Sequence, residues 1–455
     1  MPKIYSARWV LPIISPAIHC GAVAVDHSAI VSVGTLAEVT AAFPDAAHED
    51  FGNAAILPGF VNTHSHLELT VMRGFLEREE HDFFAWLKKL TVARLRMSDE
   101  DLFLSAVCGA TEAARAGITC VGDSSSFALQ SMRALQKVGL RGVVYQESFG
   151  PDPQLASDNM AKLRAQIDAV RQAETDLVRA GVSPHASYTV SAPQLEMISR
   201  VAVDEKLPVM MHAAESEAEK QFMLDGSGPF AEGLQARGIG WSAPGVSTVR
   251  YLSDHGVLDT RPLLAHCINV DDDDLELIKH AHAGIAHCPK SNAKLRHGHA
   301  PFAKFFAHEI NVGLGSDSVA SNNVCDILEE ARFATLMARA GDDNQPPSKP
   351  RRDTDAIDAL FAATLGGARA MGLDDQIGAL CEGLRADIAI VSFEGLHQLP
   401  VSDPQATLIF SSSGHDVVLT VVAGREIYRD GRVLTADGAN LSDQLNKLSV
   451  EICQD

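Results

Sequence analysis

GFVNTHSHLEL, residues 59–69, follows an apolar run that ends in Pro-Gly and places two histidines on either side of one serine. In an extended strand, side chains two positions apart point to the same face. His64 and His66 are therefore expected to stand side by side where the strand leaves the core. Two imidazoles in that arrangement would be half of a metal site. The alternative is two unrelated histidines in an ordinary strand, and the rest of the chain decides between them.

Strand and helix patterns alternate along the chain after these two histidines. Helical patterns occur at 98–116, 157–180 and 323–339. The segments with strand character are 55–64, 117–125, 141–150, 181–190, 207–216, 262–269, 284–292 and 311–321. Eight strand–helix units over about 300 residues predict a (β/α)8 barrel of the TIM type, an α/β fold.

Both ends of the chain carry short apolar stretches punctuated by Gly, Pro and Asp, a pattern typical of strands and turns. We expect these ends, residues 1–57 and 374–455, to fold together as a small β-sandwich domain. The barrel domain is then predicted to occupy residues 58–373. Within it, residues 345–353, QPPSKPRRD, are expected to form a polar, proline-rich loop.

Composition excludes several kinds of partner. The 38 Lys and Arg side chains against 59 Asp and Glu give a net charge of −21, which would repel nucleic acid. No apolar run is long enough to span a bilayer and no leader is apparent, so we expect no membrane contact. The eight cysteines are scattered without a CxxC pair, as in reduced cytoplasmic proteins. A small-molecule substrate is the expected partner, and the sequence leaves a homo-oligomer open.

Further polar groups end the later strands of the predicted barrel. His212, His266 and Asp317 each come at or near the end of an apolar run, as His64 and His66 do. The carboxyl ends of barrel strands line the active site, so these five groups are expected to converge. Three neutral imidazoles and one carboxylate suit Zn²⁺ or Fe²⁺, with one position left open for water. The sequence therefore predicts a divalent metal site at the barrel mouth.

The motifs PGFVNTHSH, HAAES, AHC, CPKSN and GLGSDSVASNN resemble those of the amidohydrolase superfamily, most closely its branch of mononuclear deaminases and chlorohydrolases. The resemblance runs from the first to the eighth predicted strand. Binuclear members carry a carboxylated lysine at strand 4, and residues 181–190 contain no lysine, which favours one metal ion. The resemblance implies that the ligands are His64, His66, His212 and Asp317, that Glu215 is the proton shuttle, and that His266 is a catalytic histidine.

Within that branch, HSHLEL, FFAWLKKL and HAAESEAEKQF look most like the aminodeoxyfutalosine deaminases of a route to menaquinone, close relatives of the methylthioadenosine and S-adenosylhomocysteine deaminases. This implies hydrolytic removal of the 6-amino group of an adenine nucleoside. It also implies that His185 contacts the bound base, with a packed barrel histidine as the alternative. Glu68, Ser291 and Asn292 are further candidates for substrate contact. For Glu68, a contact that orients a ligand histidine is the alternative.

The chemistry expected of these groups leaves other functions open. Asp317 can take a proton from water, Glu215 can protonate a ring nitrogen, and His266 can stabilise the tetrahedral adduct. One alternative is a deaminase or dechlorinase of another heterocycle, such as guanine, a pterin or a triazine. A scaffold without activity is disfavoured because every expected ligand is present. A non-haem iron oxygenase would leave the third histidine and Glu215 unexplained.

Overall fold

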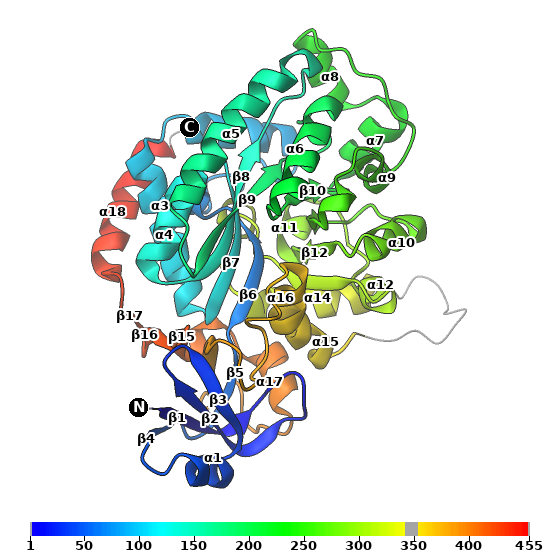
Figure 1. The fold of residues 1–455 in the computed structure, drawn as a ribbon. Helices are drawn as coiled ribbons and strands as arrows, with labels where there is room; N and C mark the ends of the chain where they lie inside the picture. The colour runs from blue at the N-terminus through cyan, green and yellow to red at the C-terminus, as the bar shows by residue number, and fades with distance from the viewer. Residues whose placement is uncertain (1, 342–353, 454–455) are drawn as a thin grey trace.

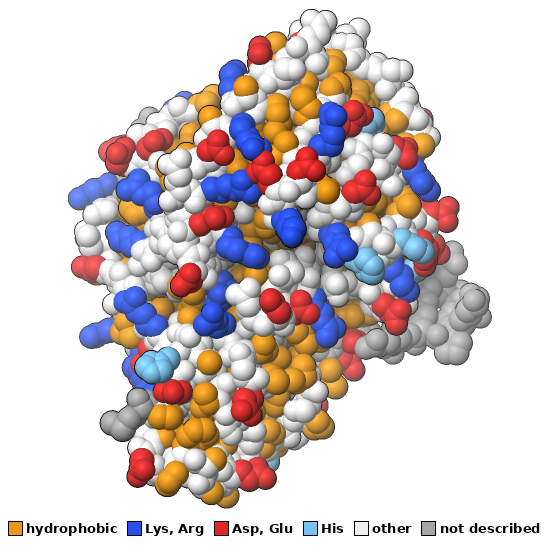
Figure 2. Space-filling model, in the orientation of Figure 1, with side chains coloured by type: hydrophobic (Ala, Val, Ile, Leu, Met, Phe, Trp, Pro, Cys, Tyr) orange, Lys and Arg blue, Asp and Glu red, His pale blue; other side chains and the backbone are white. Residues whose placement is uncertain are grey.

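The computed structural model describes residues 2–341 and 354–453, so the loop predicted at 345–353 lies outside the described residues. Figure 1 shows a barrel flanked by helices, with a smaller sheet at one end that contains both early and late segments of the chain. On the face shown in Figure 2, basic and acidic side chains are mixed with each other. Within the described part of the chain, no helix is both long and apolar enough to cross a bilayer.

The barrel is built from parallel strands, as the alternation of patterns predicts. Its hydrogen-bonded order is β10-β11-β12-β13-β6-β7-β8-β9, and bridges from Val182 to Val209 and from Ala186 to His212 bring β9 against β10. These strands are β6 (Phe60–Ser65), β7 (Ile118–Ser125), β8 (Arg141–Ser148), β9 (Val178–Pro184), β10 (Met210–Ala213), β11 (Leu263–His266), β12 (Gly284–His287) and β13 (Asn311–Leu314).

Helices surround the barrel and connect its strands. The longer ones are α2 (Phe83–Arg94), α3 (Asp99–Arg115), α4 (Ala128–Val138), α5 (Ala156–Gln172), α6 (Ala192–Glu205), α7 (Glu217–Asp225), α8 (Pro229–Ala236), α10 (Asp272–His280) and α14 (Ile327–Gly341). The shorter ones are α9 (Thr248–Asp254), α11 (Pro289–Lys294), α12 (Phe302–Ala307), α13 (Val319–Asn322), α15 (Ala356–Phe361) and α16 (Gly367–Ala370), with a 3-10 turn η1 (Leu67–Met72) after β6.

The helix predicted at 157–180 is wrong at its end, because α5 stops at Gln172 and β9 has begun by Val178. Between the two elements, backbone N–H groups donate to a side chain and not to a helical carbonyl. The Thr175 hydroxyl accepts from the N–H groups of Leu177 and Val178. Such local acceptors compete with helical hydrogen bonding and favour a turn.

Both chain ends join in one mixed sheet, ordered β17-β16-β15-β14-β5-β1-β2-β3, with β4 paired to β1. Gly59 links this sheet to the barrel. A Cβ at this position would lie 2.1 Å from the Thr119 side chain, which is too close for a carbon atom. The predicted domain boundaries stay a prediction. The elements are β1 (Lys3–Val10), β2 (Ile18–Asp26), β3 (Ala29–Thr35), α1 (Leu36–Ala42), β4 (Ala47–Asp50), β5 (Ala54–Pro58), β14 (Ile388–Ser392), α17 (Pro404–Ser411), β15 (Val417–Val422), β16 (Arg425–Arg429) and β17 (Arg432–Val433).

Two features tie the ends of the chain to the barrel. Arg141, at the start of β8, donates through Nε to Asp387 Oδ2 at 2.9 Å and through Nη2 to Oδ1 at 3.1 Å, and both side chains are buried. A C-terminal helix that the sequence reasoning missed, α18 (Gly438–Ile452), packs against α3. Its apolar side chains Leu448 and Ile452 join the cluster that also contains Trp86 of α2.

Candidate active site

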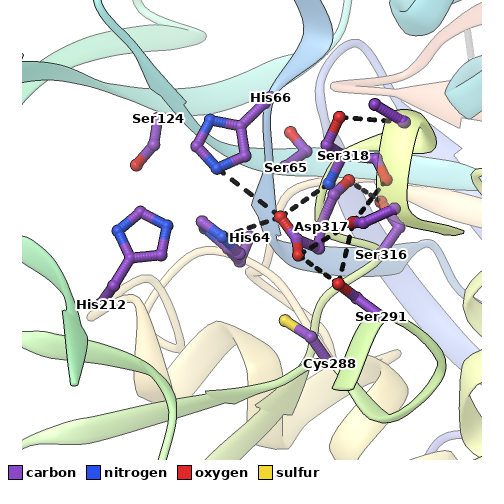
Figure 3. A network of polar contacts seen from close by, with 12 residues as sticks. His64, Ser65, His66, Ser124, His212, Cys288, Ser291, Ser316, Asp317 and Ser318 are labelled. Carbon is purple, nitrogen blue, oxygen red and sulfur yellow. Dashed lines mark hydrogen bonds and ion pairs between the residues drawn. The ribbon is translucent and has the colours of Figure 1, made fainter. Parts of the chain in front are cut away.

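The predicted metal-binding groups meet at the carboxyl end of the barrel strands. Figure 3 shows His64, His66 and His212 around the space that the Asp317 carboxylate faces. Asp317 Oδ1 lies 3.3 Å from His64 Nε2 and 3.6 Å from His66 Nε2. The rings of His64 and His212 have their centroids 4.9 Å apart, and His266 lies in the same cluster. All five groups predicted from strand ends are therefore brought together.

Residues that follow neighbouring strands, His185 after β9 and Ser291 and Asn292 in α11, fix the orientation of these groups. His212 Nδ1 donates to the backbone carbonyl of His185 at 3.0 Å, and His266 Nδ1 donates to Asn292 Oδ1 at 2.9 Å. Asp317 Oδ2 accepts from the Ser291 hydroxyl at 2.5 Å. With Nδ1 engaged in this way, His212 and His266 each present Nε2 to the centre of the cluster.

The donor set fits a divalent metal ion. His64 is fully buried, and neither of its ring nitrogens has a hydrogen-bond partner in the described structure. Burial lowers the pKa of His64 to about 3, so the ring is in the neutral form that a metal requires. Unpaired buried nitrogens are costly unless something binds them, and nitrogen ligands with one carboxylate suit a metal such as zinc.

Backbone geometry at the strand ends aims two of these side chains at the cluster. His266 has a φ of 73° and Asp317 a φ of 54°, both in the left-handed region. That conformation is unfavourable for residues other than glycine, and it is often found where function constrains the chain. Here it turns the chain sharply as it leaves β11 and β13.

Glu215 stands at the edge of the cluster, between β10 and α7. Its Oε1 lies 3.6 Å from His266 Nε2 and 3.8 Å from His297 Nε2. Burial raises the pKa of Glu215 to about 7, so the carboxyl group exchanges a proton near neutral pH. The Glu215 backbone N–H donates to Glu219 Oε2 at 2.8 Å. The backbone at Glu215 is thus held in place, and its carboxyl group can deliver a proton.

A cavity of about 220 Å³ opens onto these groups. One wall is a stripe of α2, a helix that begins at Phe83 because the Asp82 carboxylate caps its first N–H groups. Positions along this stripe recur with helical spacing. The stripe consists of Phe83, Trp86, Leu87, Leu90, Thr91 and Arg94. A larger hollow of about 790 Å³ lies between α3 and α18 and is lined by none of the metal-cluster residues. The smaller cavity is therefore the candidate active site.

Comparison with known proteins bears on this site. Residues 55–427 match the model described as the amidohydrolase family. The chain belongs to the amidohydrolase family. Residues 21–46 also match the bacterial imidazolonepropionase-like composite domain. The chain is 30% identical over 417 residues to the 5-methylthioadenosine/S-adenosylhomocysteine deaminase of Syntrophobacter fumaroxidans. The matched region covers 91% of this chain and 90% of that protein.

Solved structures share the fold. The adenosine deaminase of Xanthomonas campestris with bound zinc superimposes with a TM-score of 0.85 at 25% identity, over 99% of this chain and 98% of that one. The aminofutalosine deaminase of Helicobacter pylori in complex with methylthio-coformycin gives a TM-score of 0.77 at 21% identity, over 93% and 100% of the two chains. The latter likeness concerns the fold alone.

Of the other residues predicted for the site of this amidohydrolase, only some line the cavity. His185 lines the cavity, with its ring 4.6 Å from that of His212. Ser291 donates to Asp317 and Asn292 accepts from His266, and their predicted contact with the substrate stays a prediction. Glu68 is fully buried and is not among the residues that line the cavity.

Sequence reasoning missed several residues of the amidohydrolase cavity, among them Glu147, Tyr188 and Arg94. Glu147 lies next to the last residue of β8, and the strand-end rule that found the ligands would have found it too. Burial opposes ionisation of Glu147, but the Arg94 guanidinium and the nearby imidazoles together outweigh it and lower its pKa to about 2. Tyr188 and Arg94 had no comparable signal.

Proposed function

We propose that this amidohydrolase is a metal-dependent deaminase that hydrolytically removes the 6-amino group of an adenine nucleoside and releases ammonia. The observation that carries the proposal is Glu215, a buried acid with a pKa near 7, placed 3.6 Å from His266 at the edge of the ligand cluster. Protonation of a ring nitrogen beside the attacked carbon is the step that such an acid serves. The likeness to the 5-methylthioadenosine/S-adenosylhomocysteine deaminase of Syntrophobacter fumaroxidans supports the same reaction.

His64, His66, His212 and Asp317 would hold one divalent ion, with Zn²⁺ the first choice and Fe²⁺ the second. When bound, the ion supplies the Lewis acidity that makes water a nucleophile near neutral pH. His64, His66 and Asp317 offer ligand atoms within 4.8 Å of one another, and His64 and His212 meet the same limit together with His266.

The protein's own groups account for the proton movements. Asp317 accepts a proton from the attacking water, since its carboxylate is held in the cluster by Ser291. Glu215 donates a proton to the ring nitrogen next to the amino-bearing carbon, which makes that carbon more electrophilic. His266, whose Nδ1–H is engaged by Asn292 Oδ1, presents Nε2 as an acceptor that orients the attacking water and then the hydroxyl of the adduct. The proton held by Asp317 then passes to the departing amino group, Glu215 recovers a proton from the adduct hydroxyl, and ammonia leaves.

The substrate class is tested by turnover. We expect a fall in adenine absorbance and stoichiometric ammonia release with at least one of methylthioadenosine, S-adenosylhomocysteine, adenosine and aminodeoxyfutalosine. Guanine, a pterin and a chlorotriazine serve as comparison substrates. Turnover of one of these, without turnover of any adenine nucleoside, would contradict the proposal.

The acid is tested separately. Glu215→Gln should keep the bound metal and lose on the order of 10²-fold or more in kcat, the scale of general acid–base catalysis. Glu196→Gln, which makes the same chemical change on the exposed side of α6, is the matched control. A near-normal kcat in Glu215→Gln would assign ring protonation to another group.

A further inference from the structure

Glu147 is a buried carboxylate in the cavity that the proposed reaction does not use. It lies on β8, its residue is 5% exposed, and it lines the same cavity as the ligand cluster. The contacts of Glu147 therefore indicate its role.

One oxygen of this carboxylate is fixed by protein groups. Ser126 Oγ donates to Glu147 Oε2 at 2.7 Å. Arg94 Nη1 donates to Ser126 Oγ at 3.2 Å and lies 3.9 Å from the same carboxylate oxygen. Arg94, Ser126 and Glu147 thus form a chain of contacts across the cavity wall, and the carboxylate cannot rotate freely.

The other oxygen has no hydrogen-bond donor among residues 2–341 and 354–453. His66 Nδ1 lies 3.9 Å from Oε1, beyond hydrogen-bonding distance. A buried carboxylate that lacks donors is costly, and the cost falls when a ligand supplies them. A donor from the substrate is therefore the natural partner of Oε1.

The layout of the cavity indicates which part of a nucleoside reaches this oxygen. In the proposed reaction the ring atoms that react lie next to Glu215 and His266, on the β10 and β11 side. Glu147 and His185 line the cavity from β8 and from just after β9, beside Phe149, and Arg94 of α2 lines it next to them. A base held at the metal cluster directs its sugar toward that side, and the sugar offers two adjacent hydroxyl donors.

We propose that Glu147 binds the ribose hydroxyl groups of the substrate and makes the site selective for ribonucleosides. The inference rests on the proposed deaminase function. Arg94 and Ser126 act as positioning residues for this carboxylate. A role confined to orienting the proposed ligand His66 is the competing explanation, and it makes no distinction between sugars.

The test compares wild type and Glu147→Gln on adenosine, 2′-deoxyadenosine and 3′-deoxyadenosine. Loss of a hydrogen bond to a charged acceptor should lower kcat/KM for adenosine by about 10- to 100-fold in the variant. For at least one deoxynucleoside, which lacks the donor, the variant should lose no more than a few-fold. Metal content should match that of wild type, and Glu196→Gln should behave as wild type on all three substrates.

Equal fold losses on all three substrates, or a fall in metal content, would overturn the inference in favour of a role through His66 and would leave the deaminase proposal intact. An unchanged kcat/KM for adenosine in Glu147→Gln would overturn it as well. Wild-type enzyme that turns over no adenine nucleoside would instead overturn the deaminase proposal, and this inference with it.

Discussion

Glu219 holds the loop that carries the proposed acid, and its removal gives a measurable prediction. The side chain is fully buried in α7. Its Oε2 accepts the Glu215 backbone N–H at 2.8 Å, while Oε1 accepts the hydroxyls of Ser187 at 2.8 Å and Thr248 at 3.2 Å. One carboxylate therefore connects the Glu215 loop to the segment after β9 and to α9.

Glu219→Ala should lower the free energy of unfolding by about 2–4 kcal/mol. Most of the loss comes from the Glu215 N–H, since an unpaired buried donor costs about 1–3 kcal/mol. The two hydroxyls can rotate toward other acceptors, so they add less. The same change should lower kcat by about 10²-fold, because a shift of about 1 Å in a positioned group has that effect. Urea unfolding and steady-state ammonia release measure the two losses.

Glu219→Gln is the matched control for this loop. Its amide oxygen can accept the Glu215 N–H while its NH₂ group donates to hydroxyls that have turned, so most of the stability and of kcat should return. A merely structural role would change stability without changing kcat. The reasoning is refuted if Glu219→Ala keeps normal kcat while it is still folded at the assay temperature.

Other predictions concern the metal, the junction with the small sheet and acid stability. Wild type should hold close to one divalent ion per chain by elemental analysis, and His66→Ala should lose both ion and turnover. Arg141→Met leaves Asp387 buried without its cation and should cost about 3–5 kcal/mol in urea unfolding, with kcat unchanged. Arg429 lowers the pKa of Glu49 from 4.5 to about 2. The stability that Glu49 contributes is therefore present above pH 4.5 and lost as the pH falls toward 2, so the gap in unfolding free energy between wild type and Glu49→Gln should close over that range.

The sequence predicted the barrel and the ligand cluster because both depend on local patterns. Each ligand lies at or near the end of an apolar strand, and the order of strands in a barrel brings such ends together. The wall of the cavity could not be predicted in the same way. The apolar spacing of α2 indicates a buried helix face, but only the tertiary fold decides whether that face covers core or cavity.

Glu68 and Glu147 show the limit more sharply. Glu68 follows His66 by two residues, so extended geometry would put it on the ligand face. The chain instead enters the turn η1 directly after His66, and the alternation of faces ends there. Glu147 belongs to a strand that stays regular up to Ser148, and it does reach the cavity. Strand-end reasoning therefore holds only as far as the strand itself continues, which a sequence pattern does not reveal.

The hydrogen bonds around the cluster also bear on how many ions it can hold. Glu147, His185 and His212 offer ligand atoms within 4.8 Å of one another, which suggests a second ion beside the first. His212 cannot serve both, since its Nδ1 is committed to the backbone carbonyl of His185 and only Nε2 is left. His185 Nδ1 is also engaged, by the Thr189 hydroxyl at 3.0 Å. Residues 181–190 supply no lysine to bridge two ions. These hydrogen bonds favour the proposed single ion and leave Glu147 Oε1 available to the substrate.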